Sequence, residues 1–230
     1  TVMESIKSIQ GRISKDRKRT NLLKDTEQAT LAWLCSVLPQ WMTSDILTFI
    51  GFVGSLVVFT GFCLAKFNIY FLTLSIVGLM IQWFGDSLDG RIAYYRNVSR
   101  KWYGLALDMC MDWVSTGLMG FGFYFFMEPP YKVIALLFVA AYAWSMILAL
   151  LRYKIINVYS IDSGMVGPTE LRIGIAIMLV MAMVIPNSLV IVAAIVTGIV
   201  YIVNFIDFYK ILKYGDDTDR EEKRELQRDN

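Results

Sequence analysis

The stretch ILTFIGFVGSLVVFTGFCLA, residues 46–65, contains twenty consecutive residues without a charged side chain. A helix of about 20 residues crosses the ~30 Å hydrocarbon core of a bilayer. Two further uncharged runs of similar length cover residues 67–85 and 133–151. Hydrophobic residues form 56% of the 230-residue chain and the mean hydropathy is +0.51, more than a soluble core of this size conceals from water. The sequence therefore predicts an all-α integral membrane protein.

Three more spans are predicted from the remaining apolar sequence. Residues 173–206 carry no charge but are too long for one span, and the turn-forming pair Pro186–Asn187 divides them into two helices. Residues 113–127 are too short alone, so the third span must begin near Gly104 and include Asp108 and Asp112. The six predicted transmembrane helices cover approximately residues 44–66, 68–96, 103–127, 131–154, 168–186 and 188–213.

The segments outside these spans define the remaining organisation. We expect a basic arm over residues 1–27, an amphipathic interfacial helix over 28–42, the six-helix membrane domain over 43–213 and a charged, disordered tail over 214–230. With a cytoplasmic N-terminus, all but Lys66 and Lys132 of the 22 lysines and arginines lie on the inner side. The positive-inside rule therefore predicts that both termini are cytoplasmic.

Composition excludes several kinds of catalytic and binding site. The chain has no histidine, which removes Ser-His-Asp, Cys-His and His-zinc schemes. The three cysteines, Cys35, Cys63 and Cys110, lie in apolar or amphipathic segments and are expected to be reduced packing residues. The net charge of only +2 gives no indication of a nucleic-acid partner.

Four aspartates lie near the inner ends of the second and third predicted spans. Asp86 and Asp89 are three residues apart and Asp108 and Asp112 are four apart, so each pair shares one helix face. Carboxylates gathered at low dielectric repel one another, and this number of oxygen ligands suits Mg²⁺ or Mn²⁺. The pattern predicts a divalent-metal site. The alternatives are acids that merely face water at the helix ends, an ion-permeation path or a proton relay.

The order Asp-x2-Asp-Gly-x2-Ala and then Gly-x3-Asp-x3-Asp, over residues 86–112, resembles the signature of the CDP-alcohol phosphatidyltransferases. The resemblance implies that the six-helix domain is catalytic. The implied reaction moves a phosphatidyl group from CDP-diacylglycerol, or a similar CDP-lipid, to the hydroxyl of a small polar acceptor and releases CMP. The acceptor stays open between phosphorylated ones, such as inositol phosphate or glycerol phosphate, and serine or inositol.

The resemblance also implies roles for particular residues. Asp86, Asp89 and Asp108 would hold two Mg²⁺ or Mn²⁺ ions, and Asp112 would assist at the metals and act as the base. Tyr94 stands where the family usually has arginine, so either Arg91 or Arg96 would replace it near the nucleotide. The full set expected to bind the donor is Gly90, Arg91, Ala93, Arg96 and Gly104. For the two glycines, close helix packing is the alternative role.

A second cluster is predicted at the inner ends of the fourth and fifth spans. Arg152 and Lys154 end the fourth span, and Glu170 and Arg172 open the fifth. Arg152-x-Lys154 resembles a basic pair in family members that use phosphorylated acceptors, so these four residues are expected to bind the acceptor, with Glu170 orienting Arg172. The alternative is that the basic side chains extend to lipid head groups.

Two other functions remain open. One is a CDP-choline or CDP-ethanolamine:diacylglycerol phosphotransferase, which is less favoured because related enzymes of that branch are thought to use a histidine. The other is a divalent-cation transporter, whose site would be expected near the bilayer midplane on broken helices. The expected partners are the CDP-lipid donor, the small acceptor and membrane lipids, and a homodimer is left open as the assembly.

Overall fold

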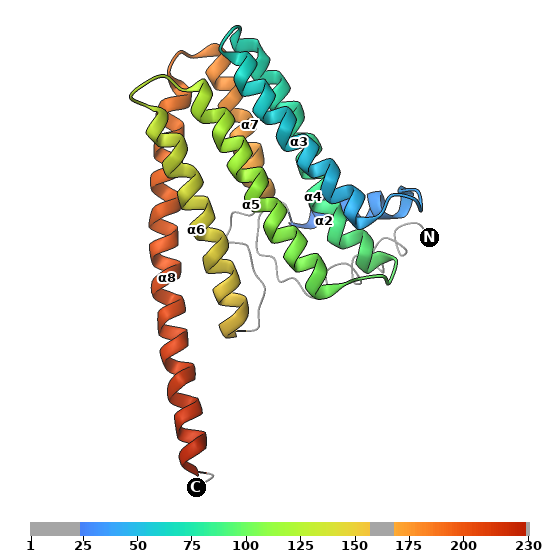
Figure 1. The fold of residues 1–230 in the computed structure, drawn as a ribbon, viewed down its shortest axis with the longest axis vertical. Coiled ribbons are helices and arrows are strands. Elements are labelled where there is room, and N and C mark those ends of the chain that lie inside the picture. The colour runs from blue at the N-terminus through green and yellow to red at the C-terminus, as the bar shows by residue number, and fades with distance from the viewer. Residues whose placement is uncertain (1–23, 157–167, 229–230) are drawn as a thin grey trace.

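The computed structural model describes residues 24–156 and 168–228, and all regular secondary structure in these two ranges is helical. The prediction of an all-α protein is confirmed. Most of the predicted basic arm, residues 1–23, lies outside the described part of the chain. The helices are α2 (Lys24–Val37), α3 (Ser44–Ala65), η1 (Ile69–Phe71), α4 (Leu72–Tyr95), α5 (Lys101–Phe126), α6 (Lys132–Ile156), α7 (Pro168–Val184) and α8 (Ser188–Arg228) (Figure 1).

Helices α3 to α8 occupy the positions of the six predicted spans, and local signals account for several of their ends. The Thr43 hydroxyl caps α3 by accepting a hydrogen bond from the Ile46 amide at 3.3 Å. The predicted turn at Pro186–Asn187 separates α7 from α8, and Asn187 adopts a positive φ of 63° there. Asparagine tolerates this left-handed conformation better than most residues, which explains the sharp reversal.

The end of α8 differs from the prediction. We expected the last span to end near residue 213 and the tail to be disordered, but α8 runs for 41 residues to Arg228. In Figure 1 its C-terminal part projects beyond the other helices. The tail mixes charges of both signs at helical spacing, and Arg220 pairs with Asp216 at 2.9 Å one turn away. Such local pairs favour helix where low hydrophobicity alone suggested disorder.

Four helical segments of the described chain are long and apolar enough to cross a membrane: Ser44–Ala65, Ile69–Tyr95, Lys132–Ile155 and Ser188–Glu221. The chain is therefore an integral membrane protein. Helices α5 and α7 fall outside this group. Helix α7 has only 17 residues, and α5 carries Asp108 and Asp112 in its first half. The structure thus confirms six helices in this region but supports four of them as spans.

Helices α3 and α4 are in backbone contact along glycine-lined faces. A Cβ atom added at Gly54 would lie 2.4 Å from the backbone nitrogen of Gln82, and one added at Gly85 would lie 2.3 Å from that of Gly51. Only glycine lets the backbones of α3 and α4 approach this closely. Close contacts at small residues are common between membrane helices. The contact fixes the register of α4 against α3 and brings the C-terminal half of α4 beside the start of α3.

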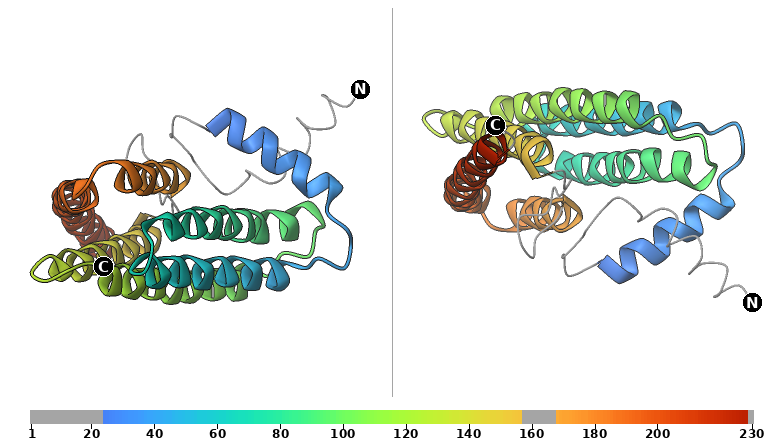
Figure 2. Two further views of the ribbon diagram at one scale, coloured as in Figure 1. Left: turned by 90° about the horizontal axis from the view of Figure 1, so that it is seen from above. Right: turned by 90° about the horizontal axis from the view of Figure 1, so that it is seen from below.

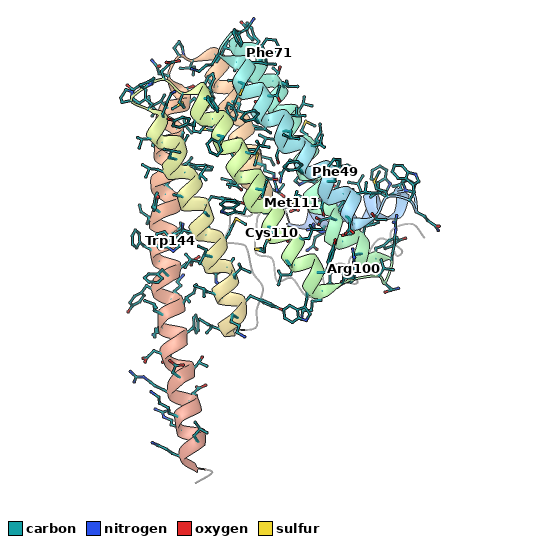
Figure 3. All side chains as sticks on the ribbon, in the orientation of Figure 1. Phe49, Phe71, Arg100, Cys110, Met111 and Trp144 are labelled. Carbon is teal, nitrogen blue, oxygen red and sulfur yellow. The ribbon has the colours of Figure 1, made fainter. Side chains whose placement is uncertain are left out.

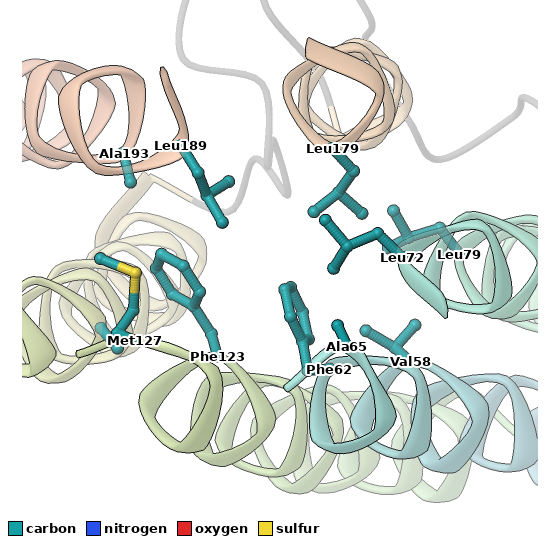
Figure 4. Close-up of a cluster of buried hydrophobic side chains, with 11 residues drawn as sticks. Val58, Phe62, Ala65, Leu72, Leu79, Phe123, Met127, Leu179, Leu189 and Ala193 are labelled. Atoms are coloured by element: carbon teal, nitrogen blue, oxygen red, sulfur yellow. The ribbon is translucent and has the colours of Figure 1, made fainter. Parts of the chain in front are cut away.

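Apolar side chains fill the opposite end of the bundle, where α3 ends and α4 begins. They come from α3 to α8 and pack between these helices, and Figure 4 shows most of them. The buried members are Val58, Phe62, Ala65, Leu72, Leu79, Phe123, Met127, Ala135, Leu179, Leu189 and Ala193. On the other flank of the molecule, Trp144 of α6 packs against Tyr201, Phe205 and Phe208 of α8 (Figure 3). The apolar cluster and the ring contacts of Trp144 together join α6, α7 and α8 to the α3–α4–α5 group.

Helix α2 lies beside the C-terminal half of α4 (Figure 2). It is amphipathic, as predicted, although it begins and ends earlier than the expected range of 28–42. Leu31 and Cys35 are buried against Leu47 of α3 and against Leu88 and Ile92 of α4. The opposite face is exposed and includes Trp33 and Val37, and Trp41 is exposed in the linker that follows. The helix therefore packs one face on the bundle and leaves an aromatic, apolar face uncovered.

Candidate functional site

Three of the four predicted aspartates converge. The side chains of Asp86 on α4 and Asp108 and Asp112 on α5 each offer a carboxylate oxygen, and these oxygens lie within 4.8 Å of one another. Helices α4 and α5 are both packed on α3 and run in opposite directions, so the end of one meets the start of the other (Figure 1). Three carboxylate oxygens this close together could hold a metal ion, and carboxylates are preferred ligands of hard divalent cations such as Mg²⁺.

Asp89 lies one helical turn beyond Asp86 and has separate partners. The Thr48 hydroxyl of α3 donates to Asp89 Oδ2 at 2.7 Å, and the amide of Gly90 donates to Oδ1. Asp89 is buried, while the other three carboxylates are half-buried. Sequence reasoning missed Thr48, although a polar residue within an apolar span is itself a signal of a functional or packing contact.

All four aspartates line one open cavity of about 230 Å³. The other lining residues are Thr48, Gly51 and Phe52 of α3, Gln82 of α4, and Met111 and Ser115 of α5. Met111 and the neighbouring Cys110 mark this stretch of α5 in Figure 3. The cavity is open to the outside, and its carboxylate, hydroxyl and amide groups are ligands suited to hard metal ions.

Arg172 of α7, one of the residues expected to bind the acceptor, lies against this cluster. Its Nη2 donates to Asp86 Oδ2 at 2.5 Å and its Nε donates to Gln82 Oε1 at 2.6 Å. Gln82 and Asp86 are one turn apart on α4, so the guanidinium lies along that helix. Gln82 was not predicted from the sequence. It stands four residues before the first aspartate, inside an otherwise apolar run, and that position was the available signal.

Arg152, which the sequence analysis expected at the acceptor site, pairs with an acid of α8. Its Nη2 donates to Asp207 Oδ2 of α8 at 2.7 Å. The lining of the cavity does not include Arg152. Its partner, Asp207, is a residue that the sequence analysis did not single out.

The other two residues of the second cluster are less closely tied to the cavity. Lys154 is exposed, one half-turn beyond Arg152 on α6. Glu170 is half-buried in the first turn of α7, two residues before Arg172. The lining of the cavity includes neither of them.

The two arginines that were expected to contact the donor, Arg91 and Arg96, contact other groups of the protein. Arg91 is buried between α2 and α4, where its Nη2 lies 3.8 Å from Glu27 Oε1 and its Nη1 donates to the Ser87 carbonyl. Arg96 donates to four backbone carbonyls at the end of α2 and in the linker to α3, those of Leu38, Pro39, Gln40 and Met42, at 2.7–3.2 Å. Arg96 thus holds the linker between α2 and α3 against the end of α4.

The small residues of the motif lie beside the cavity. Gly90 is half-buried next to Asp89, and Ala93 is buried on α4. Gly104 is exposed in the first turn of α5, and an added Cβ there would meet open space. None of these three, nor Arg91 or Arg96, is in the lining of the described cavity. In sequence they follow Asp89 at the end of α4 or precede Asp108 at the start of α5.

Comparison with known proteins identifies the family. The chain matches the family model of the CDP-alcohol phosphatidyltransferases over residues 41–204. A search of curated proteins finds no match. The matched range is more than two thirds of the chain and includes α3 to α7, the start of α8, all four aspartates and Arg172. The resemblance of the aspartate motif is thereby confirmed, and the chain belongs to the CDP-alcohol phosphatidyltransferase family of membrane transferases, which move a phosphatidyl group from a CDP-alcohol to an acceptor.

Proposed function

We propose that the protein is a metal-dependent enzyme of phospholipid synthesis that transfers a phosphatidyl group from CDP-diacylglycerol, or a similar CDP-lipid, to a small polar hydroxyl acceptor. The observation that carries the proposal is the convergence of Asp86, Asp108 and Asp112 within 4.8 Å, beside Arg172. The family match supports the class of reaction. The choice of donor and acceptor belongs to the proposal.

The donor set of the cavity fits Mg²⁺ or Mn²⁺. It is made mainly of the carboxylate oxygens of four aspartates, supplemented by the hydroxyls of Thr48 and Ser115, with Met111 as the one sulfur-containing side chain and no imidazole. Asp86, Asp89, Asp108 and Asp112 would hold two such ions. When bound, the ions would offset the charge of the donor pyrophosphate and the charge that develops on departing CMP.

Asp112 is the proposed base. In the proposed step, the acceptor oxygen attacks the phosphorus next to the lipid, the bond from that phosphorus to the oxygen of CMP breaks, and the hydroxyl proton passes to an Asp112 oxygen. The chain contains no histidine that could take this proton. A carboxylate has a low intrinsic pKa near 3.9, so the precise placement of the acceptor hydroxyl must supply much of the activation.

Arg172 is the proposed anion-binding residue of the site, because its guanidinium lies on the carboxylate cluster. Arginine presents several N–H donors in a planar fork that matches phosphate oxygens. Gly104 leaves open space at the side of the cavity where the nucleotide would approach. Arg91 and Arg96 would act indirectly, by fixing α2 and the α2–α3 linker against the motif-bearing end of α4.

We also propose that α5 and α7 span the membrane together with the four more apolar helices. Helix α5 packs between α3 and α6, and α7 packs on α4 and α8, so their polar residues face protein more than lipid. Helix α2 would lie in the inner interface, with exposed Trp33 and Trp41 among the lipid head groups. Both termini and the aspartates would then be cytoplasmic.

The test is a turnover assay with the purified full chain in lipid nanodiscs. Radiolabelled CDP-diacylglycerol is supplied with glycerol phosphate, inositol phosphate, serine or inositol, and CMP release and lipid product are measured. We expect CMP release with one of these acceptors in Mg²⁺ or Mn²⁺ and none in excess EDTA. Full turnover in EDTA would contradict the metal role. Product from CDP-choline and diacylglycerol alone would favour the rival phosphotransferase.

A further inference from the structure

Two ion pairs of similar burial join helices of this bundle. Arg172 and Asp86 pair between α7 and α4, with side chains 15% and 19% exposed, and Arg152 and Asp207 pair between α6 and α8, with side chains 19% and 15% exposed. The two acids differ in their surroundings. Asp86 is one of three converging carboxylates, whereas Asp207 is not part of that group. The guanidinium of Arg172 therefore contacts the atoms that are proposed to bind metal.

The contact with Gln82 shows how Arg172 is held in place independently of Asp86. Gln82 is buried and accepts from the Arg172 Nε, while Nη2 donates to Asp86. An arginine carries five N–H donors, so its Nη groups can change partner while the Nε bond persists. Gln82 thus keeps the guanidinium at the cavity wall whichever anion its Nη groups contact.

Charge makes Arg172 and a divalent cation competitors. The three carboxylates repel one another at this separation, and the ion pair with Arg172 relieves part of that repulsion. A divalent cation among the same oxygens relieves more of it. The cation and the guanidinium would then repel each other within the half-buried cavity, where screening by water is weak.

We propose that Arg172 is the internal countercharge of the aspartate cluster and competes with the divalent cation for Asp86, so that metal binding frees its Nη groups for a phosphate oxygen. This inference rests on the proposed function, because it takes the cluster to be the metal site. It makes metal binding a precondition for phosphate binding by Arg172. The phosphate belongs either to the CDP-lipid donor or to a phosphorylated acceptor.

The first test measures Mn²⁺ affinity, by the electron paramagnetic resonance signal of free Mn²⁺, for the full chain in nanodiscs. Arg172→Gln should bind Mn²⁺ about tenfold or more tightly than the natural chain, because a repelling charge is removed. Arg172→Lys keeps the charge and should stay close to the natural affinity. Arg152→Gln is the matched control, since it breaks a pair of the same burial away from the cluster, and should leave Mn²⁺ affinity unchanged.

The outcomes separate this inference from the proposed function. Absence of Mn²⁺ binding to the natural chain would refute the metal site itself, and with it the competition. Normal Mn²⁺ binding to the natural chain with equal or weaker binding to folded Arg172→Gln would refute only the competition. A gain in Arg172→Lys as large as that in Arg172→Gln would also overturn the inference, because it would show that charge is not the cause.

A second measurement needs no variant and keeps the proposal testable if Arg172→Gln does not fold. Phenylglyoxal modifies accessible guanidinium groups, and mass spectrometry reports the modification of each arginine. Arg172 should be modified severalfold faster when Mn²⁺ is present, and Arg152 should react at the same rate with and without it. An Arg172 rate that does not respond to Mn²⁺ would overturn the inference.

The source of the phosphate is then identified by binding experiments in the presence of Mn²⁺. The probes are CDP-diacylglycerol and glycerol phosphate, each measured with the natural chain and with Arg172→Gln. Selective loss of glycerol phosphate binding assigns Arg172 to the acceptor, and selective loss of CDP-diacylglycerol binding assigns it to the donor. Unchanged binding of both probes would refute the release of Arg172 to a phosphate.

Discussion

The two ends of the α3–α4–α5 group are built from the same helices and have opposite chemistry. At one end Phe62, Phe123 and Leu179 belong to an apolar core that is drawn in Figure 4. At the other end, four aspartates and Thr48 line an open cavity. Between the two ends, glycines bring α3 and α4 into backbone contact. The apolar end therefore holds the helices together, the polar end leaves an open cavity, and the glycine contact between α3 and α4 supports both ends.

The largest loss of folding and turnover is expected from breaking the glycine contact between α3 and α4, on which both ends depend. In Gly54→Leu the new side chain would meet the α4 backbone, since even a Cβ would lie 2.4 Å from the Gln82 nitrogen. The helices must separate, so both the apolar core and the aspartate cluster should be lost. We expect little folded protein by size-exclusion chromatography and no turnover. Gly104→Leu, at a position with open space, is the control for stability.

The next largest effect should be confined to the polar end. Asp112→Asn preserves side-chain shape but removes the basic oxygen, so turnover should fall by about 10²–10⁴-fold, the usual contribution of a general base. Thermal stability should be close to that of the natural chain, and Mn²⁺ should still bind, although more weakly. Turnover rates and thermal unfolding of the same preparation measure both quantities. Near-normal turnover would reject Asp112 as the base.

A change at the apolar end should lower thermal stability and leave turnover nearly unchanged. Phe62→Ala removes a buried ring that contacts Phe123 and Phe126, and comparable truncations cost about 3–5 kcal/mol in soluble cores. The midpoint of thermal unfolding should fall, while the turnover rate per folded molecule at low temperature should change by less than about threefold. A large loss of turnover in the folded fraction would show that the two ends are not independent.

A smaller effect is expected at the second ion pair. Arg152→Gln should leave the apparent acceptor KM within about twofold of the natural value, because Arg152 pairs with Asp207 and is not in the lining of the cavity. Steady-state rates against acceptor concentration provide the measurement, with Arg172→Gln as the comparison. A severalfold rise in KM would restore Arg152 to the acceptor site that its sequence position suggested.

The smallest effect concerns the contact of α2 with the motif-bearing end of α4. Burial raises the pKa of the Cys35 thiol to about 11, although nearby Arg91 and Arg96 act to lower it. The folded state therefore favours the neutral thiol, and this contribution to stability should be constant below pH ~8.5 and should fade as the pH rises toward 11. Cys35 should resist maleimide at pH 8 until detergent unfolds the chain. Rapid labelling of the folded protein would show that α2 detaches.

Local sequence patterns determined much of this protein. The lengths of uncharged runs set the positions of α3 to α8, because a helix satisfies its backbone hydrogen bonds internally and depends mainly on the hydropathy of its own residues. The pair Pro186–Asn187 set the turn between α7 and α8 for an equally local reason. The spacing of Asp86 and Asp89, and of Asp108 and Asp112, placed each pair on one helix face and carried the signature of the family.

The tertiary structure alone decided which charged groups meet. Four arginines with similar sequence signals received four different partners: Asp86 and Gln82 for Arg172, Asp207 for Arg152, Glu27 for Arg91, and backbone carbonyls for Arg96. Each choice depends on the distance and rotation between two helices, which glycine contacts and apolar packing set across the whole bundle. Hydropathy and spacing describe one helix at a time, so they carry no information about the partner that a long, flexible arginine side chain will find on another.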